Sequence, residues 1–319
     1  MTTLAMVIPC YNEEEVLPET TSRLASLLAD LHQRGKVADG YRVYYVDDGS
    51  KDATWRIIGE QARTHDFVCG IKLSRNRGHQ NALLAGLMTA QADVVISVDA
   101  DLQDDLAAIE QMLDAYQGGC DIVFGVRKAR KTDSVFKRFT AEAYYRLLAL
   151  MGVEIVFNHA DYRLMSRRAI EALRQYGEAN LFLRGIIPQL GFTTGTVYYD
   201  RAERFAGESK YPLSKMLALA LQGITSFSVV PLRIITTMGL LISAISFGIG
   251  LWAVWVRIYT DEAIPGWAST VLPMYFLGGI QLLSLGVIGE YLGKIYMEAK
   301  ARPRYFIAEV FDRSGKPKD

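Results

Sequence analysis

The sequence predicts a doubly wound, mostly parallel α/β sheet followed by two membrane-spanning helices. Short apolar strands alternate with helical patterns over residues 1–125, as in sheets built from right-handed crossovers. Polar clusters follow the strands, where such sheets bind ligands. The last third contains charge-free stretches of 23 and 27 residues. Each exceeds the roughly 20 apolar residues that cross the hydrocarbon core of a bilayer.

Five apolar runs are the expected strands, and helical patterns separate them. In order, the strands are LAMVIP, YRVYYV, FVCGIKL, DVVISV and CDIVFG, and the helices cover Glu13–Gln33, Thr54–Thr64, Gln80–Ala90 and Leu106–Tyr116. The segments that follow the strands are CYNEEE, DDGSKD, SRNRGHQ, DADLQDD and VRKARK. Because parallel strands end at one edge, we expect these segments to share a site.

Composition narrows the possible partners and the compartment. The 319 residues carry no formal net charge, so we expect no nucleic-acid partner. Cys10, Cys69 and Cys120 lie within or at the end of apolar runs without metal-ligand spacing, which favours buried, reduced thiols in a cytosolic domain. The chain opens directly into a strand, so no signal peptide is expected.

The two charge-free stretches predict a multi-pass protein of the inner (plasma) membrane. The loop between them, RIYTDEA, has one Arg and two acids, whereas Lys and Arg flank the pair, so the N-terminal domain and the tail should be cytoplasmic. One basic, amphipathic segment and one charge-free segment should lie at the membrane–water interface. The expected parts are a cytoplasmic domain (1–210, with an interfacial helix at 133–151), a second interfacial helix (211–231), spans at 232–257 and 264–290, and a tail (291–319).

The run VDADLQDD places carboxylates where a buried strand should end. Asp99 and Asp101 lie two residues apart, a spacing at which they can share one Mg²⁺ or Mn²⁺ with the phosphate oxygens of a substrate. Capping of the following helix is an alternative explanation that suits Asp104 or Asp105 well. It explains Asp99 and Asp101 poorly.

Several motifs together resemble the family-2 glycosyltransferases of GT-A fold, a Rossmann-like sheet. They are VIPCYNEEEVL, VDDGSKDAT and SVDADLQDD. Further segments resemble the polyprenyl-phosphate glycosyltransferases, the group of dolichol-phosphate mannose synthase and the bactoprenol glucosyltransferases: ADYRLMSRRA, RAERFAGESKYPLSKM, ITSFSVVPLRI and GEYLGKIYMEAKARPRYF. The similarity covers nearly the whole chain. The family often has Pro after DLQD, where this chain has Asp105.

The resemblance implies roles for individual residues. The nucleotide-binding residues are Pro9, Tyr11, Glu13, Asp47, Asp48 and Asp99; the metal-binding residues are Asp99, Asp101 and Gln103; and the catalytic residues are Asp101 and Asp161. An aromatic ring can stack on a base and carboxylates can accept its N–H groups, although DDGS is also a good turn sequence.

A lipid-linked acceptor is expected because the enzyme carries its own membrane helices. Its phosphate needs cations, and the candidates are Arg127, Arg130, Lys131, Arg201, Arg204 and Lys210. The basic run Arg127–Arg138 would equally bind anionic lipid headgroups. Gly278 and Gly279 would allow membrane helices to pack closely in a homo-oligomer.

The resemblance implies inverting transfer of a sugar to undecaprenyl phosphate, for cell-envelope glycans such as lipopolysaccharide. UDP-glucose is the leading donor, and UDP-N-acetylglucosamine, GDP-mannose and a UDP-4-amino-arabinose derivative remain alternatives. His79, Gln80 and Asn81 lie where recognition of an acetamido group would differ. A noncatalytic membrane scaffold of GT-A fold is the alternative of a different class, but an intact Asp-x-Asp pair disfavours it.

Asp161 is the residue whose role is least determined. A phosphate nucleophile is largely ionised at neutral pH because its second pKa is about 6, so it scarcely needs a general base. We therefore expect Asp161 to position the acceptor by pairing with an arginine or approaching the metal. The simpler alternative is a loop residue paired with Arg163 or Arg167.

Overall fold

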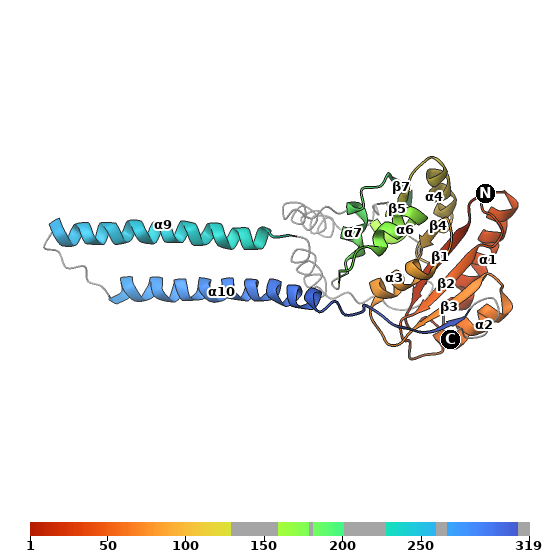
Figure 1. Ribbon diagram of the computed structural model, residues 1–319, viewed down its shortest axis with the longest axis horizontal. Helices are drawn as coiled ribbons and strands as arrows, with labels where there is room; N and C mark the ends of the chain where they lie inside the picture. Colours follow the sequence, from red (N-terminus) through yellow and green to blue (C-terminus); the bar gives the residue numbers. More distant parts are fainter. Residues whose placement is uncertain (129–158, 179–180, 201–227, 260–266, 312–319) are drawn as a thin grey trace. The chain divides into compact units, whose positions relative to one another are not determined.

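The computed structural model describes residues 1–128, 159–178, 181–200, 228–259 and 267–311. These residues form two compact units. One unit contains a mixed sheet, its helices and the C-terminal strand. The other contains the long helices α9 (Val230–Tyr259) and α10 (Trp267–Ala299) (Figure 1).

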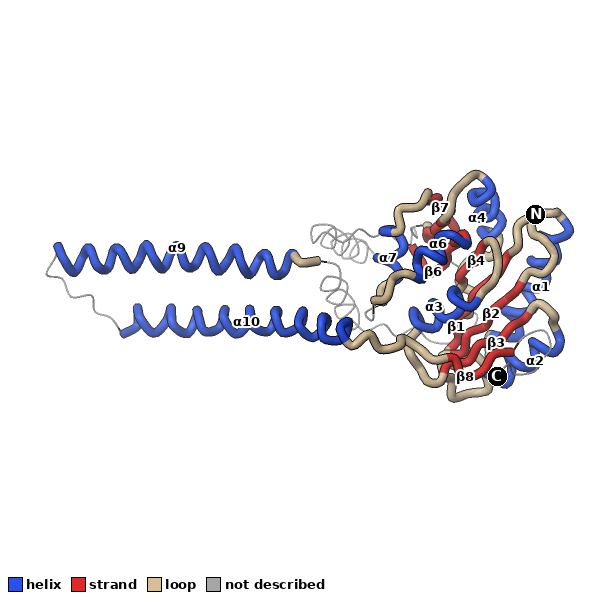
Figure 2. Tube along the Cα trace, viewed as in Figure 1, coloured by secondary structure: helices blue, strands red, loops and turns tan. Residues whose placement is uncertain are grey.

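The α/β unit is built on an eight-stranded sheet in the order β7-β5-β6-β4-β1-β2-β3-β8 (Figure 2). Its strands are β1 (Leu4–Cys10), β2 (Arg42–Asp47), β3 (Val68–Leu73), β4 (Val94–Ser97), β5 (Ile122–Arg127), β6 (His159–Ser166), β7 (Thr194–Tyr199) and β8 (Ile307–Phe311). Strand β6 runs antiparallel between β4 and β5, β8 runs antiparallel beside β3, and the remaining pairs are parallel. The predicted mostly parallel α/β fold is confirmed.

Helices cover both faces of this sheet. They are α1 (Leu17–Gln33), α2 (Thr54–Thr64), α3 (His79–Thr89), α4 (Ala108–Gln117), α6 (Arg167–Arg174) and α7 (Leu183–Gln189). Met6 and Ile8 of β1 join one buried cluster with residues of α1, α2 and α4. Val7 points the other way, toward α3. The all-apolar β1 therefore has a helical layer on each side, as a buried parallel strand requires.

Helix α1 begins later than its predicted start at Glu13. It begins at Leu17, and its first turn contains Pro18, which lacks the N–H that a first turn leaves unpaired. The residues before it instead contact the loop after β2 and the start of α2, because Glu14 N–H donates to Asp52 Oδ2 (3.2 Å) and Glu13 N–H donates to Thr54 Oγ1 (2.9 Å). This segment thereby becomes part of the carboxyl edge of the sheet.

The C-terminal region differs from the tail expected at 291–319. Its first residues continue α10 to Ala299, and Ile307–Phe311 form β8 at the edge of the sheet. Phe311 stacks on Trp55 with ring centroids 4.7 Å apart. Ser74 N–H donates to the Phe306 carbonyl (2.9 Å). Strand β8 thus covers an edge that would otherwise expose unpaired backbone groups.

A tight contact between α3 and the sheet gives a stability prediction. A Cβ atom on Gly86 would lie 2.9 Å from a methyl of Val46 and closer still to a methyl of Val7. We expect Gly86→Ala to destabilise the α/β unit by about 1–3 kcal/mol, because overpacking forces a buried layer apart. Thermal unfolding in detergent measures this. Gly177→Ala, where nothing lies within 4 Å of the added atom, is the control, and equal midpoints for both variants would contradict the prediction.

Helices α9 and α10 each contain a segment that is long and apolar enough to span a membrane. These segments are Val230–Ile249, with mean hydropathy 1.8, and Phe276–Ala299, with mean hydropathy 1.3, and neither is buried within the protein. The hydroxyl of Tyr291 in α10 donates to the Ser228 carbonyl just before α9 (2.5 Å). The two predicted membrane helices are therefore present as long helices with exposed apolar surfaces.

Candidate active site

The registers of the parallel strands bring the polar loops to one edge. Cys10 at the end of β1 pairs with Asp47 at the end of β2, and Asp47 pairs with Lys72 near the end of β3. On the other side of β1, Val7 pairs with Ser97, the last residue of β4. The loops that follow these four strands therefore lie side by side, as the sequence predicts.

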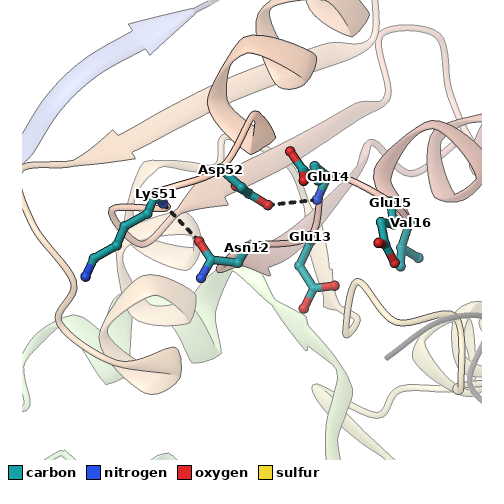
Figure 3. Close-up of a pocket in the computed structure, with 7 residues that line it drawn as sticks. All are labelled: Asn12, Glu13, Glu14, Glu15, Val16, Lys51 and Asp52. Carbon is teal, nitrogen blue, oxygen red and sulfur yellow. Dashed lines mark hydrogen bonds between the residues drawn. The ribbon is translucent and has the colours of Figure 1, made fainter. Parts of the chain in front are cut away.

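The first two of these loops are joined by reciprocal hydrogen bonds around an open hollow of about 430 Å³. Lys51 N–H donates to Asn12 Oδ1 (2.9 Å), and Glu14 N–H donates to Asp52 Oδ2 (3.2 Å) (Figure 3). Asn12 itself has φ 56°, a conformation that Asn tolerates better than most residues. The hollow is lined by Asn12, Glu13, Glu14, Glu15, Val16, Lys51 and Asp52.

The two neighbouring aspartates after β2 have different partners. Asp48 accepts backbone hydrogen bonds from Arg77 (2.6 Å) and Gly78 (2.8 Å) with its two oxygens, so it holds the loop after β3. Asp47 accepts one from Ser50 (3.1 Å), while its Oδ2 is buried without a partner among the described residues. Asp47 therefore has the oxygen with more capacity to accept a ligand N–H.

The loop after β4 positions Asp99 and Asp101. Gln103 N–H donates to Asp101 Oδ1 (3.2 Å). Leu102 between them has φ 56°, which is strained for a residue with a Cβ. Such outliers concentrate at functional sites, where the surrounding structure holds them.

The charge around Asp99 fits a bound cation. Desolvation by the surrounding protein, opposed by His79 and reinforced by Asp104, Asp161 and Asp101, raises the pKa of Asp99 to about 6. Among the described residues no group of three or more His, Cys, Asp or Glu side chains is arranged to hold a metal. Two carboxylates still suit Mg²⁺ or Mn²⁺, because such ions take their remaining ligands from substrate phosphates and water.

Asp161 lies at the centre of a cluster of charged side chains. Ser97 at the end of β4 pairs with Arg163 of β6, and Ser97 Oγ donates to the Asp161 carbonyl, so Asp161 lies beside the end of β4, where the loop with Asp99 begins. His79 Nε2 lies 3.6 Å from Asp99 Oδ1 and 3.6 Å from Asp161 Oδ2. Arg184 donates from Nε and Nη2 to the two oxygens of Asp161 (3.3 and 3.2 Å), and Arg163 donates to Oδ1.

These partners make Asp161 a weak base. Burial alone would raise the pKa of Asp161, but the nearby His79 and the charges of Arg163 and Arg184 outweigh it and hold the pKa well below its usual value. The pairing with Arg163 is one of the two that the sequence suggested. Arg167 instead donates to the Ala90 carbonyl (2.8 Å) and pairs with Glu171.

Asp104 does not cap α4, because its side chain is buried in a different contact. Its Oδ1 accepts from Tyr199 Oη (2.5 Å) and from Arg127 Nη2 (3.3 Å). Asp105 does not cap α4 either, because the N-cap position is Ala107 and no side chain caps it; Asp105 Oδ1 accepts from Ala107 N–H (2.9 Å) in the turn before the helix. Arg127, a predicted phosphate ligand, thus lies at the end of β5 in a contact with the loop after β4.

The remaining predicted site residues divide into two groups. Pro9 is buried in β1, and Tyr11 is exposed just beyond it. The structure does not describe Arg130, Lys131, Arg201, Arg204, Lys210, the first expected interfacial helix (133–151) or residues 211–227 of the second, whose last two residues, Val230 and Pro231, begin α9. Sequence reasoning missed Arg184, a single arginine in FLRGI without a recognisable motif, and linked His79 only to sugar recognition. The Asp-x-Asp motif does not predict either residue, because both are distant from it in sequence and come near it only in the folded chain.

The family model for glycosyl transferase family 2 matches residues 5–174, more than half of the chain. This chain belongs to glycosyl transferase family 2. The matched range contains the four loops at the carboxyl edge and the Asp161 strand. The resemblance predicted from the motifs is confirmed.

Similarity to individual family-2 glycosyltransferases extends over nearly the full length. The chain is 49% identical over 306 residues to the uncharacterized glycosyltransferase YkoT of Bacillus subtilis (strain 168), covering 95% of this chain and 90% of that one. It is 40% identical over 305 residues to the bactoprenol glucosyl transferase of Shigella phage SfV, covering 95% and 97%. The prophage bactoprenol glucosyl transferase homolog of Escherichia coli (strain K12) is 39% identical over 311 residues, covering 96% and 99%.

Proposed function

We propose that this glycosyltransferase moves a sugar, with inversion, from a nucleotide donor to a polyprenyl phosphate at the cytoplasmic face of the membrane. The main support is the 40% identity to a bactoprenol glucosyl transferase over 95% of the chain, a range that includes both long apolar helices. A polyprenyl phosphate is a lipid, so an enzyme that carries its own membrane helices meets it at the interface. UDP-glucose is the proposed donor.

The nucleoside is proposed to bind between the loops after β1 and β2. Tyr11 is exposed there and offers a ring for stacking on the base. The buried Oδ2 of Asp47 is suited to accept an N–H of the base. Asp48 supports the site indirectly, since its carboxylate holds the backbone of Arg77 and Gly78.

Asp99 and Asp101 are proposed to hold Mg²⁺ or Mn²⁺, with Gln103 beside them. A divalent ion bound there would neutralise the diphosphate that leaves when the sugar is transferred. Asp161, kept ionised by its arginine partners, is proposed to position the acceptor rather than remove a proton from it. The acceptor's phosphate oxygen is already ionised at neutral pH.

One assay tests the proposed function directly. Purified protein in detergent is incubated with undecaprenyl phosphate and one of UDP-glucose, UDP-N-acetylglucosamine, GDP-mannose or a UDP-4-amino-arabinose derivative, and the lipid product is measured. We expect glucosyl lipid from UDP-glucose and little product from the others. Product from another donor would correct the sugar, and no lipid product from any donor would reject the acceptor class.

A labelling experiment tests the proposed topology. Basic residues flank the pair of long helices and acids lie in the loop between them, so the loop should be outside and the C-terminus inside. In a Cys120→Ser background, Thr260→Cys should react with an impermeant thiol reagent added to intact cells. Lys316→Cys should react only after the membrane is opened, and labelling of both in intact cells would contradict two spans.

A further inference from the structure

Two arginines share the carboxylate of Asp161. Arg163 and Arg184 both pair with it. Arg163 is 1% exposed, and its Nε and Nη1 are buried without a hydrogen-bond partner among the described residues. Buried charges and donors normally have partners, so this part of the site is suited to a second anion.

The two arginines differ in how accessible they are to such an anion. Arg163 is enclosed in β6, whose backbone is fixed when Ser97 Oγ donates to the Asp161 carbonyl. Arg184 lies at the start of α7 with 37% of its side chain exposed. The start of α7 is anchored to α3 because Leu183 N–H donates to Gln80 Oε1 (3.0 Å). Arg163 can therefore keep Asp161 paired while Arg184 turns toward a ligand.

We propose that Arg184 is a phosphate-binding residue of this site, and that Asp161 holds its guanidinium in place until the phosphate arrives. A guanidinium that binds both oxygens of a carboxylate presents the two parallel N–H groups that phosphate recognition uses. His79 touches both Asp161 and Asp99, so Arg184 lies beside the carboxylates proposed to hold the metal. The inference rests on the proposed function for its substrates, and the phosphate belongs either to the nucleotide diphosphate or to the lipid acceptor.

Binding measurements without turnover test this inference and distinguish the two sources. Full-length protein in detergent is titrated with UDP in the presence of Mn²⁺ and, separately, with a short-chain isoprenyl phosphate. We expect Arg184→Gln to weaken the binding of one or both probes by about tenfold to a hundredfold, the effect expected for loss of one charge-assisted contact. Arg184→Lys should weaken binding less. Arg174→Gln, which alters an exposed arginine paired with Glu171, is the control and should bind as the wild type does.

A second variant separates phosphate binding from a purely structural ion pair. Asp161→Asn releases Arg184. This variant should therefore bind the probe that Arg184→Gln binds weakly, at least as tightly as the wild type does, while its sugar transfer falls. Equal weakening by Asp161→Asn and Arg184→Gln would overturn the inference, as would Arg184→Gln binding both probes within about twofold of the wild type. Wild-type protein that binds a probe but transfers no sugar would reject only the proposed function, and failure to bind either probe would reject both.

Discussion

Asp99→Asn and Asp101→Asn are each expected to lower sugar transfer by about a hundredfold or more, because each removes a carboxylate proposed to hold the divalent ion that would stabilise the departing diphosphate. Burial, reinforced by neighbouring carboxylates, raises the pKa of Asp99 to about 6, so the site favours a bound cation. An excess of chelator should stop the wild-type enzyme, and added Mn²⁺ or Mg²⁺ should restore it. Rates of lipid-product formation across a range of metal concentrations measure both effects.

The same loop provides the matched control. Asp105 is exposed, and its carboxylate accepts only a local hydrogen bond from Ala107 N–H among the contacts described for it. Asp105→Asn should therefore retain near-wild-type transfer and metal dependence. Full activity in excess chelator would remove the divalent ion from the proposed mechanism, and equal losses in all three variants would indicate a disturbed loop instead.

Asp161→Asn is also expected to impair transfer by about a hundredfold or more, since a displacement of about 1 Å can cost that much. The pKa of Asp161 is held well below its usual value by His79, Arg163 and Arg184 against the opposing effect of burial. A carboxylate with so low a pKa binds protons weakly. We therefore attribute its contribution to positioning rather than to general base catalysis.

The pH dependence of the Asp161→Asn deficit distinguishes these roles. If Asp161 were the base, the deficit should shrink as rising pH ionises the acceptor; if it positions, the deficit should stay nearly constant from about pH 6.5 to 8.5, above the second pKa of the phosphate. Removing one partner of a buried ion pair also destabilises a protein, so thermal unfolding must show that the variant is folded. Asp161→Glu, which keeps the charge but moves it, should be impaired as well, and its recovery to the wild-type rate would contradict positioning.

The sequence was sufficient for features that depend on local pattern. Apolar runs with intervening helical periodicity predicted β1 to β5 and α1 to α4 in order. The polar loops after those strands were predicted to meet because parallel strands all end at one edge. The start of α1 was misplaced, since the hydrogen bond that Glu13 N–H donates to Thr54 Oγ1 at the start of α2 overrides the helical pattern there.

Tertiary structure decided the features that depend on distant pairing. The last strand, β8, pairs with β3 across more than 200 residues, and it was not predicted from the sequence. The antiparallel register of β6 against β4 brings Asp161 beside the end of β4, and α3 and α7 add His79 and Arg184. Sequence spacing predicts which residues follow a strand, but the register of an antiparallel partner and the orientation of a packed helix depend on contacts across the whole sheet. The sequence alone therefore determined the family, the strand ends and the Asp-x-Asp pair, whereas the arginine and histidine partners of Asp161 appeared only in the folded chain.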